Sequence, residues 1–310
     1  MQLMMESRSR GVLDTPLSRG MTGLCRATPT LLWIVAGCAL LPLCAQAEGI
    51  DTEHTFAFMI GSDVGEAGER EIQSQTTGRF AKATGTYRAL TQATELELVP
   101  IANFRAEFAL VAASHDIGGV AGLDDLRQIG VQGVSLDLRY RFLNKEAAPF
   151  GLTFAAEMHT DRLDETSGQQ VRKYGTDFAL AFDRELIPNK LVAAVNFLYQ
   201  PESTNFLATS KTEQDATLGV AWAMMAQIKP GLFIGGEARY LRKYDGLGLD
   251  GFAGHALFVG PTVFLKLSER SRLTAAWSFQ VAGRSVAVPG SLDLVDFERH
   301  QARLVYGINF

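Results

Sequence analysis

The chain has 310 residues, of which 47% are hydrophobic and 20% charged, and its formal net charge at pH 7 is −5. This balance fits one large soluble domain or a barrel whose apolar residues are spread along strands, and the acidic charge argues against a nucleic-acid partner. Downstream of residue 47 no stretch has the roughly 18 to 20 uninterrupted apolar residues of a membrane helix. If the chain crosses a membrane, it does so as strands.

Residues 1–47 have the pattern of an export signal. Positively charged residues precede an apolar run at 31–41, and Ala45-Gln46-Ala47 then offers a small-residue cleavage site. We expect cleavage after Ala47, with Met21 as a possible true start, and a lipoprotein-type cut at Cys38 as the alternative. All three cysteines lie in this segment, so the rest of the chain has no disulfide framework or thiolate metal site.

Residues 48–68 precede the first predicted strand as a periplasmic segment. They contain the apolar run Phe56-Ala57-Phe58-Met59-Ile60, which should not remain in water. We expect residues 53–61 to fold into the inner mouth of a barrel as a partial plug; an extra strand, or an extension of the first one, is the alternative. Acidic residues around the glycine-rich stretch 61–68 are interpreted as a solvated turn, with calcium binding as the alternative.

From residue 69 onward the chain divides into segments of ten or more residues with alternating apolar and polar side chains. Such lengths exceed the usual strand of a globular protein and suit a tilted membrane strand. The predicted strands are 69–80, 86–99, 104–115, 130–142, 149–162, 174–186, 189–201, 212–228, 231–244, 254–267, 271–284 and 297–310. Short turns and longer polar connections alternate between them, which is the asymmetry of outer-membrane barrels.

The last strand strengthens this interpretation. Apolar side chains alternate up to an aromatic terminal residue at Leu304, Tyr306, Ile308 and Phe310. This ending resembles the C-terminal assembly signal of Gram-negative outer-membrane β-barrels. The resemblance implies that the barrel-assembly machinery and outer-membrane lipids are partners, and that the protein resides in the cell outer membrane.

We therefore predict an all-β fold, a transmembrane antiparallel up-and-down β-barrel of about twelve strands over residues 69–310. At the level of class this stretch is similar to transporter-type barrels of the MetA-like phenol-degradation group, a resemblance that implies a passive channel or porin-like transporter for small molecules. No functional residue is carried over from that group. A soluble barrel, with its apolar face inward, and a structural barrel without transport are the alternatives.

Strand parity places many charged side chains on the inner face. The expected pore-lining residues are Glu95, Glu97, Arg105, Glu107, Asp137, Arg139, Arg141, Glu157, His159, Asp177, Asp183, Glu237, Arg239 and Arg303. Those at positions 97, 105, 107, 139, 141 and 183 should lie at similar depth near the inner mouth. They form either a structural network of ion pairs or a constriction that selects polar solutes. The opposite wall, at 192–278, carries mostly small, uncharged residues.

An enzyme is the alternative from another class. Ser285, His255, His300 and Glu298 fall near the outer rim, and a serine, a base and a carboxylate are the ingredients of acyl transfer. They match no lipase-barrel motif, so a surface lipid hydrolase remains the second hypothesis. We expect no enzymatic activity, no cofactor and no metal site, and the sequence does not name the solute.

Overall fold

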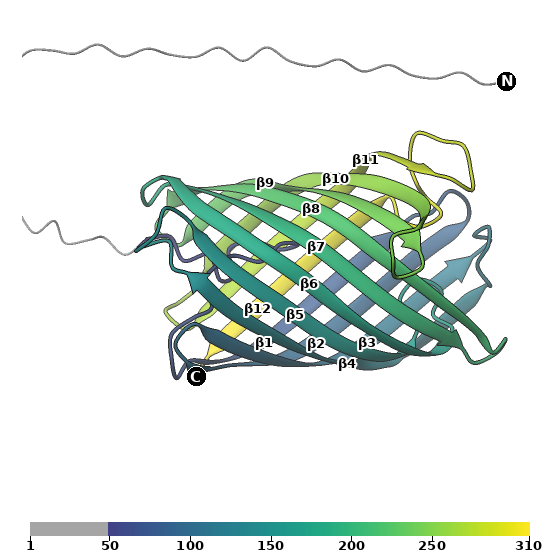
Figure 1. The fold of residues 1–310 in the computed structure, drawn as a ribbon, viewed down its shortest axis with the longest axis horizontal. Coiled ribbons are helices and arrows are strands. Elements are labelled where there is room, and N and C mark those ends of the chain that lie inside the picture. Colours follow the sequence, from purple (N-terminus) through teal and green to yellow (C-terminus); the bar gives the residue numbers. More distant parts are fainter. Residues whose placement is uncertain (1–48) are drawn as a thin grey trace, which may run out of the picture. The chain divides into compact units, whose positions relative to one another are not determined.

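The computed structural model describes residues 49–310, so the predicted export signal lies outside the described residues. These residues form one closed, antiparallel β-barrel (Figure 1). The twelve strands are β1 (Arg70–Phe80), β2 (Thr86–Ile101), β3 (Phe104–Gly118), β4 (Leu126–Leu143), β5 (Gly151–Leu163), β6 (Gln170–Ile187), β7 (Leu191–Phe206), β8 (Lys211–Lys229), β9 (Leu232–Asp245), β10 (Gly251–Lys266), β11 (Ser271–Ser285) and β12 (His300–Asn309). Each strand pairs with its neighbours in sequence, and β1 pairs with β12 to close the sheet.

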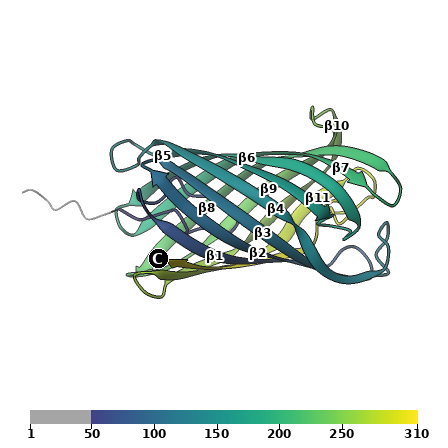
Figure 2. The same ribbon diagram turned by 90° about the horizontal axis from the view of Figure 1, so that it is seen from below.

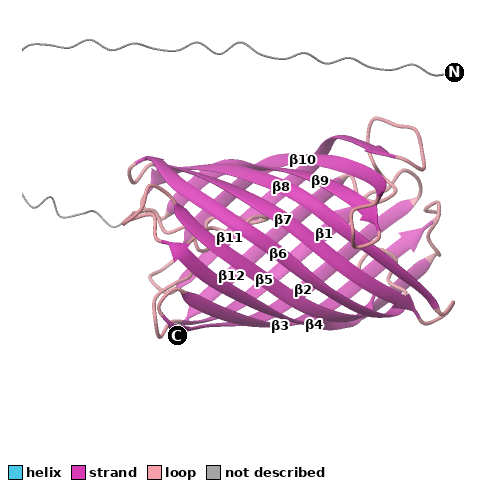
Figure 3. Cartoon of the chain, in the orientation of Figure 1, coloured by secondary structure: helices cyan, strands magenta, loops and turns pink. Residues whose placement is uncertain are grey.

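The predicted all-β barrel of about twelve strands is confirmed, and strands and loops account for the described chain in Figure 3. Within residues 49–310 no helix is long and apolar enough to cross a membrane. The strands are tilted strongly against the barrel axis, as the view from below also shows (Figure 2). Such tilt is what closing a sheet into a barrel requires.

The strand ends differ from the prediction on the outer side. The expected loop at 116–129 shrinks to 119–125, and the one at 163–173 shrinks to 164–169, because the ladder continues through further pairs such as Asp116↔Arg127 and Asp161↔Lys173. The inner connection at 144–150 is as long as the outer one at 119–125, so the strict alternation of short and long connections was wrong. Ladder hydrogen bonds use the backbone, so pairing continues after the apolar alternation has ended.

The two faces of the barrel wall differ in polarity. Large apolar side chains of alternate positions are exposed on the outside, as at Phe108, Phe197 and Trp277, whereas the neighbouring Glu107 and Asn196 are buried inside. A soluble barrel would show the reverse arrangement. A closed barrel with an apolar outer band and a polar interior is the form in which strands span a lipid bilayer. The protein is therefore an outer-membrane β-barrel.

The terminal residue provides a test of assembly. The Phe310 side chain is 63% exposed, and its backbone N–H donates to Arg70 O at 3.0 Å, so it adds little packing inside the finished barrel. We expect Phe310→Asp or deletion of Phe310 to leave the exported chain aggregated or degraded, because the last strand must be recognised before closure hides its edge. Heat-modifiability and membrane fractionation measure this.

The matched control is Leu207→Asp, which places the same charge at an exposed apolar side chain in an outer connection. This variant should assemble normally. Normal membrane-embedded, heat-modifiable protein after deletion of Phe310 would contradict the role of the C-terminal signal.

Candidate functional site

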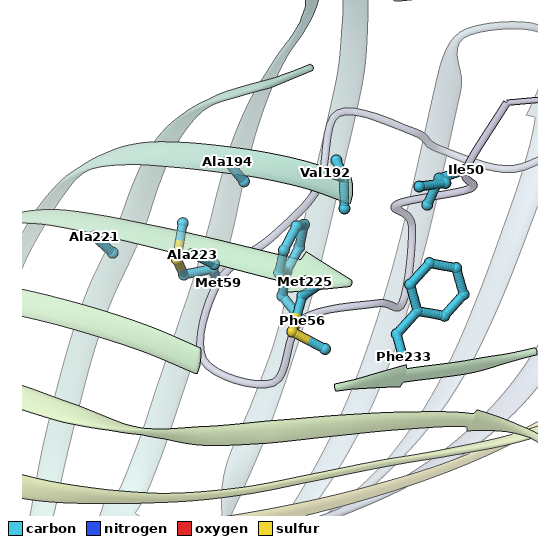
Figure 4. Packing of buried hydrophobic residues seen from close by; sticks show 9 residues of the cluster. All are labelled: Ile50, Phe56, Met59, Val192, Ala194, Ala221, Ala223, Met225 and Phe233. Atoms are coloured by element: carbon cyan, nitrogen blue, oxygen red, sulfur yellow. The ribbon is translucent and has the colours of Figure 1, made fainter. Parts of the chain in front are cut away.

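A segment without strands lies inside the barrel. We call residues 49–65 the luminal segment; in Figure 1 they run within the barrel at the end where the C-terminus lies. Three of their apolar side chains, Ile50, Phe56 and Met59, form a buried cluster with the wall (Figure 4). The wall residues in this cluster are Val192, Ala194, Ala221, Ala223, Met225 and Phe233. The segment thus packs on the part of the wall where small side chains leave room.

Polar side chains of the wall satisfy the backbone of the luminal segment. Asp183 accepts hydrogen bonds from Ser62 N at 2.6 Å and from Thr52 Oγ1 at 2.6 Å. Asn196 pairs reciprocally with the backbone of Ile60, with both distances at 2.9 Å. A segment outside the sheet has no ladder partner, so these contacts replace the hydrogen bonds that water would otherwise supply.

Gly151 of β5 allows this close approach. A Cβ atom added there would lie 1.8 Å from Ser62 Oγ, which is far inside contact distance. A residue with any side chain at this position would push the segment away from the wall.

The tip of the luminal segment is held by three residues that the sequence placed in the lumen. Glu237 accepts hydrogen bonds from Ala57 N at 2.7 Å and from Phe58 N at 2.8 Å. The guanidinium carbons of Arg239 and Arg303 lie 3.9 Å and 4.7 Å from the centre of the Phe58 ring, which are cation–π distances. Arg303 also donates to Ala57 O at 3.0 Å. The aromatic ring thereby lowers the charge repulsion between two neighbouring cations.

Carboxylates follow one another across the opposite wall. Neighbouring strands β1 to β6 each contribute one acidic residue, and consecutive members are partners in the strand register. We call this set the acidic row: Glu71, Glu97, Glu107, Asp137, Glu157 and Asp177. Like charges on directly opposed residues destabilise a sheet unless cations lie between them. Sequence parity placed five of these side chains inward but missed Glu71, because the first strand had the weakest alternation.

Arginines lie along the acidic row. Arg105, which is 2% exposed, lies 2.9 Å from Glu97 and 2.6 Å from Glu107, and it also reaches Glu53 of the luminal segment at 3.2 Å. Arg272 of β11, which the sequence analysis did not single out, pairs with Glu71. The predicted mixture of both charges near the inner mouth therefore centres on Arg105.

Two arginines of the inner mouth pair with residues outside the set that was expected at similar depth. Arg139 pairs with Asp137 at 2.6 Å, two residues away on its own strand. Arg141 reaches Asp63 of the luminal segment at 3.3 Å. Side chains two residues apart share one face of a strand, so a partner within the strand can compete with one across the lumen.

The remaining predicted side chains lie further along the wall. His159 Nδ1 lies 2.8 Å from Asp161 Oδ2, and Glu95 is buried beside Gln73, its register partner on β1. Sequence reasoning missed an outer cluster in which Lys173 contacts Glu202 at 2.9 Å and Lys243 contacts Glu202 at 3.4 Å. Residues 173 and 202 fell in predicted loops, and a longer assignment of the strands would have brought them together.

An open vestibule lies at the inner mouth. Its volume is about 840 Å³, and the luminal segment forms part of its lining together with inner turns. Charged side chains of both signs line it, including Glu71, Lys145, Lys266, Arg270 and Arg272. The vestibule extends from the inner mouth to Glu53, His54 and Asp63 of the luminal segment.

The four residues of the hydrolase hypothesis do not form a triad. The Ser285 hydroxyl accepts a hydrogen bond from Ala287 N at 3.1 Å, and Glu298 lies 3.5 Å from Arg79. The ring centres of His300 and Phe279 are 5.3 Å apart, and those of His255 and Tyr240 are 5.6 Å apart. Within residues 49–310 no hydrogen bond joins either imidazole to Ser285 or Glu298.

Asp63 anchors the luminal segment electrostatically. Lys145 forms an ion pair with its carboxylate, and Thr52 N donates to it at 2.8 Å. Burial by itself raises the pKa of Asp63, but the charge of Lys145 and the hydrogen bonds from Lys145 and Thr52 outweigh it and hold the pKa below its ordinary value of 3.8. A carboxylate with a lowered pKa stabilises the seated segment above pH 3.8, and this contribution is lost as pH falls through the lowered pKa.

We therefore expect Asp63→Asn to weaken the seating of the luminal segment at pH 7 by about 1.5–3 kcal/mol, the usual contribution of a hydrogen bond to a charged group. Hydrogen exchange of the amides at 52–62 measures this. The difference between wild type and variant should shrink as pH falls below 3.8. Glu66→Gln, which changes an exposed acid of the adjoining turn, is the control. Equal protection in wild type and Asp63→Asn at pH 7 would contradict this role.

Comparisons with known proteins agree with the barrel fold. The COG4313 outer membrane channel from Pseudomonas putida F1 is 12% identical, with a TM-score of 0.57 over 80% of this chain and 98% of that chain. The NanC porin is 9% identical (TM-score 0.44, 78% and 100% covered), and a deltaS2 mutant of the TodX monoaromatic hydrocarbon channel is 8% identical (TM-score 0.36, 79% and 91% covered). The COG4313 channel, with its TM-score of 0.57, confirms the predicted likeness to outer-membrane channel barrels as a likeness of fold.

A search of curated proteins finds no significant match. A family model matches residues 48–310, and the chain belongs to that family, the family of unknown function DUF6662.

Proposed function

We propose that the protein is a passive outer-membrane channel for small molecules that favours cations. The acidic row carries this proposal, because its carboxylates follow one another across β1 to β6 on the inner face. Its contacting cations, Arg105, Arg139 and Arg272, are fewer than the carboxylates. Rows of Asp and Glu side chains attract cations and repel anions in pores.

The size of the barrel supports a narrow passage. About 8 strands close around packed side chains, and about 16 to 18 leave an aqueous channel. A barrel of intermediate strand number therefore has a narrow lumen. The luminal segment packs against β7 to β9, on the wall opposite most of the acidic row. A solute that passes the segment therefore meets Glu157 and Asp177, the two half-buried carboxylates of the row. The COG4313 barrel, whose fold this chain shares, is described as an outer membrane channel, which is consistent with the proposal.

The proposal is tested first by ion selectivity. In planar bilayers under a salt gradient, the wild-type protein should show a reversal potential that favours K⁺ over Cl⁻. The double variant Glu157→Gln, Asp177→Asn should lower this preference by roughly fivefold, the effect of about 1 kcal/mol from charges near the ion path. Glu213→Gln, which removes an exposed carboxylate at the outer end of β8, is the control and should leave selectivity unchanged.

Two outcomes would contradict the channel proposal. A folded, heat-modifiable protein that gives no conductance would favour a structural barrel without transport. A preference for anions in the wild type would refute the role of the acidic row.

The second test removes the obstruction. Deleting residues 51–62 should increase the single-channel conductance of a still-folded barrel, because the ladder that closes the barrel does not include these residues. Deleting the exposed loop residues 287–291 is the control for shortening the chain and should not increase conductance. Unchanged conductance from the barrel that lacks 51–62 would show that the segment does not narrow the passage.

A further inference from the structure

A histidine and several glutamates converge where the luminal segment meets the wall. Glu53 and His54 belong to the segment, and Glu97 belongs to β2. One potential ligand atom from each of these three residues lies within 4.8 Å of the other two. Glu71 of β1 lies beside them, with its Oε2 3.6 Å from His54 Nε2.

The distances around His54 suit a shared cation better than hydrogen bonds. His54 Nε2 is 3.5 Å from Glu53 Oε2 and 3.6 Å from Glu71 Oε2, both beyond the range of ordinary N–H···O bonds. Two ligands that are each about 2.1 Å from a tetrahedral metal ion are separated by about 3.4 Å. The imidazole and two carboxylates are therefore spaced as neighbouring ligands of one ion.

Glu97 is a second, independent indication. Its side chain is 1% exposed, and neither carboxylate oxygen has a hydrogen-bond partner within residues 49–310. Arg105 approaches one oxygen at 2.9 Å as an ion pair, and the other has no charged or hydrogen-bonding contact. A buried carboxylate oxygen without a donor is unfavourable unless a cation accepts its lone pair.

The charges in direct contact point to a divalent ion. The carboxylates of Glu53, Glu71, Glu97 and Glu107 are paired with only two guanidinium groups, those of Arg105 and Arg272. When all four carboxylates are ionised, two negative charges are left unmatched, which is the charge that one divalent cation supplies.

We propose that Glu53, His54 and Glu97, with Glu71 beside them, bind one divalent transition-metal cation of the Zn²⁺ class. An imidazole nitrogen combined with carboxylate oxygens suits Zn²⁺, whereas Mg²⁺ and Ca²⁺ prefer ligand sets made only of oxygen. The inner vestibule gives access, because Glu53, His54 and Glu71 line it. The bound cation would connect Glu53 and His54 of the luminal segment to the wall strands β1 and β2. This site goes beyond the channel function and does not depend on it.

The test is a titration of Zn²⁺ into the full protein, extracted from membranes, folded in detergent, free of any polyhistidine tag and stripped with a chelator. Isothermal calorimetry should show one saturable Zn²⁺ site per chain and no comparable Mg²⁺ site. His54→Gln and Glu97→Gln should each weaken Zn²⁺ binding at least tenfold. Glu95→Gln, which changes the carboxylate two residues away on the same face of β2, is the matched control and should bind as the wild type does.

A second readout locates the cation. Zn²⁺ should slow hydrogen exchange of the amides at 50–56 in the wild type and in Glu95→Gln, but not in Glu97→Gln. Heat-modifiability identifies which variants are folded. The test requires only one of His54→Gln and Glu97→Gln to be folded. The proposal is overturned by a wild-type protein without saturable Zn²⁺ binding, by undiminished binding in a folded His54→Gln or Glu97→Gln variant, or by equal weakening in the Glu95→Gln control.

Discussion

The buried guanidinium of Arg105 is the contact on which the inner half of the barrel depends. It lies within ion-pair distance of Glu97, Glu107 and Glu53, so one cation serves two register neighbours of the acidic row and the luminal segment together. Without it, carboxylates that the strand register places side by side would face one another in a poorly solvated interior. Breaking a buried pair in this way costs about 3–5 kcal/mol, because the remaining charge is left without a partner. The arginine thus couples the charge of the wall to the position of the segment.

The barrel wall has two dissimilar halves, and this asymmetry places the luminal segment. Charged side chains on β1 to β6 repel one another unless ions, water or arginines lie between them, and apolar side chains packed against them would supply none of these partners. The wall from β7 to β9 carries small apolar residues such as Ala194, Ala221 and Ala223, against which Phe56 and Met59 can be buried. An apolar segment next to the acidic row would have to desolvate carboxylates. The division of the wall therefore leaves one favourable side for the apolar side chains of the segment, whereas Glu53 and His54 face the acidic row.

The fold follows from the sequence because period-two alternation is a local signal that repeats on every strand. Every predicted strand is present, and apolar side chains at alternate positions, such as Phe197 and Trp277, are exposed. The strand ends were less predictable, since the outer parts of β6 and β7 are mostly polar and carry no clear apolar alternation. The pairing of charges was less predictable still. Arg141 contacts Asp63 and Arg272 contacts Glu71 only because the barrel closes and the segment enters it, and both are nonlocal consequences that strand parity does not contain.

The contacts that hold the luminal segment are different from the contacts that close the barrel. The segment adds no strand, and its backbone groups are satisfied by side chains such as Asp183, Asn196 and Glu237. If the segment left, water would solvate these polar side chains, whereas the apolar contacts of Ile50, Phe56 and Met59 with the wall would be lost. Meanwhile the β1 to β12 ladder, which closes the sheet from Glu71↔Asn309 to Phe80↔His300, uses no residue of the segment. The closure of the barrel wall therefore does not depend on the segment that occupies its lumen.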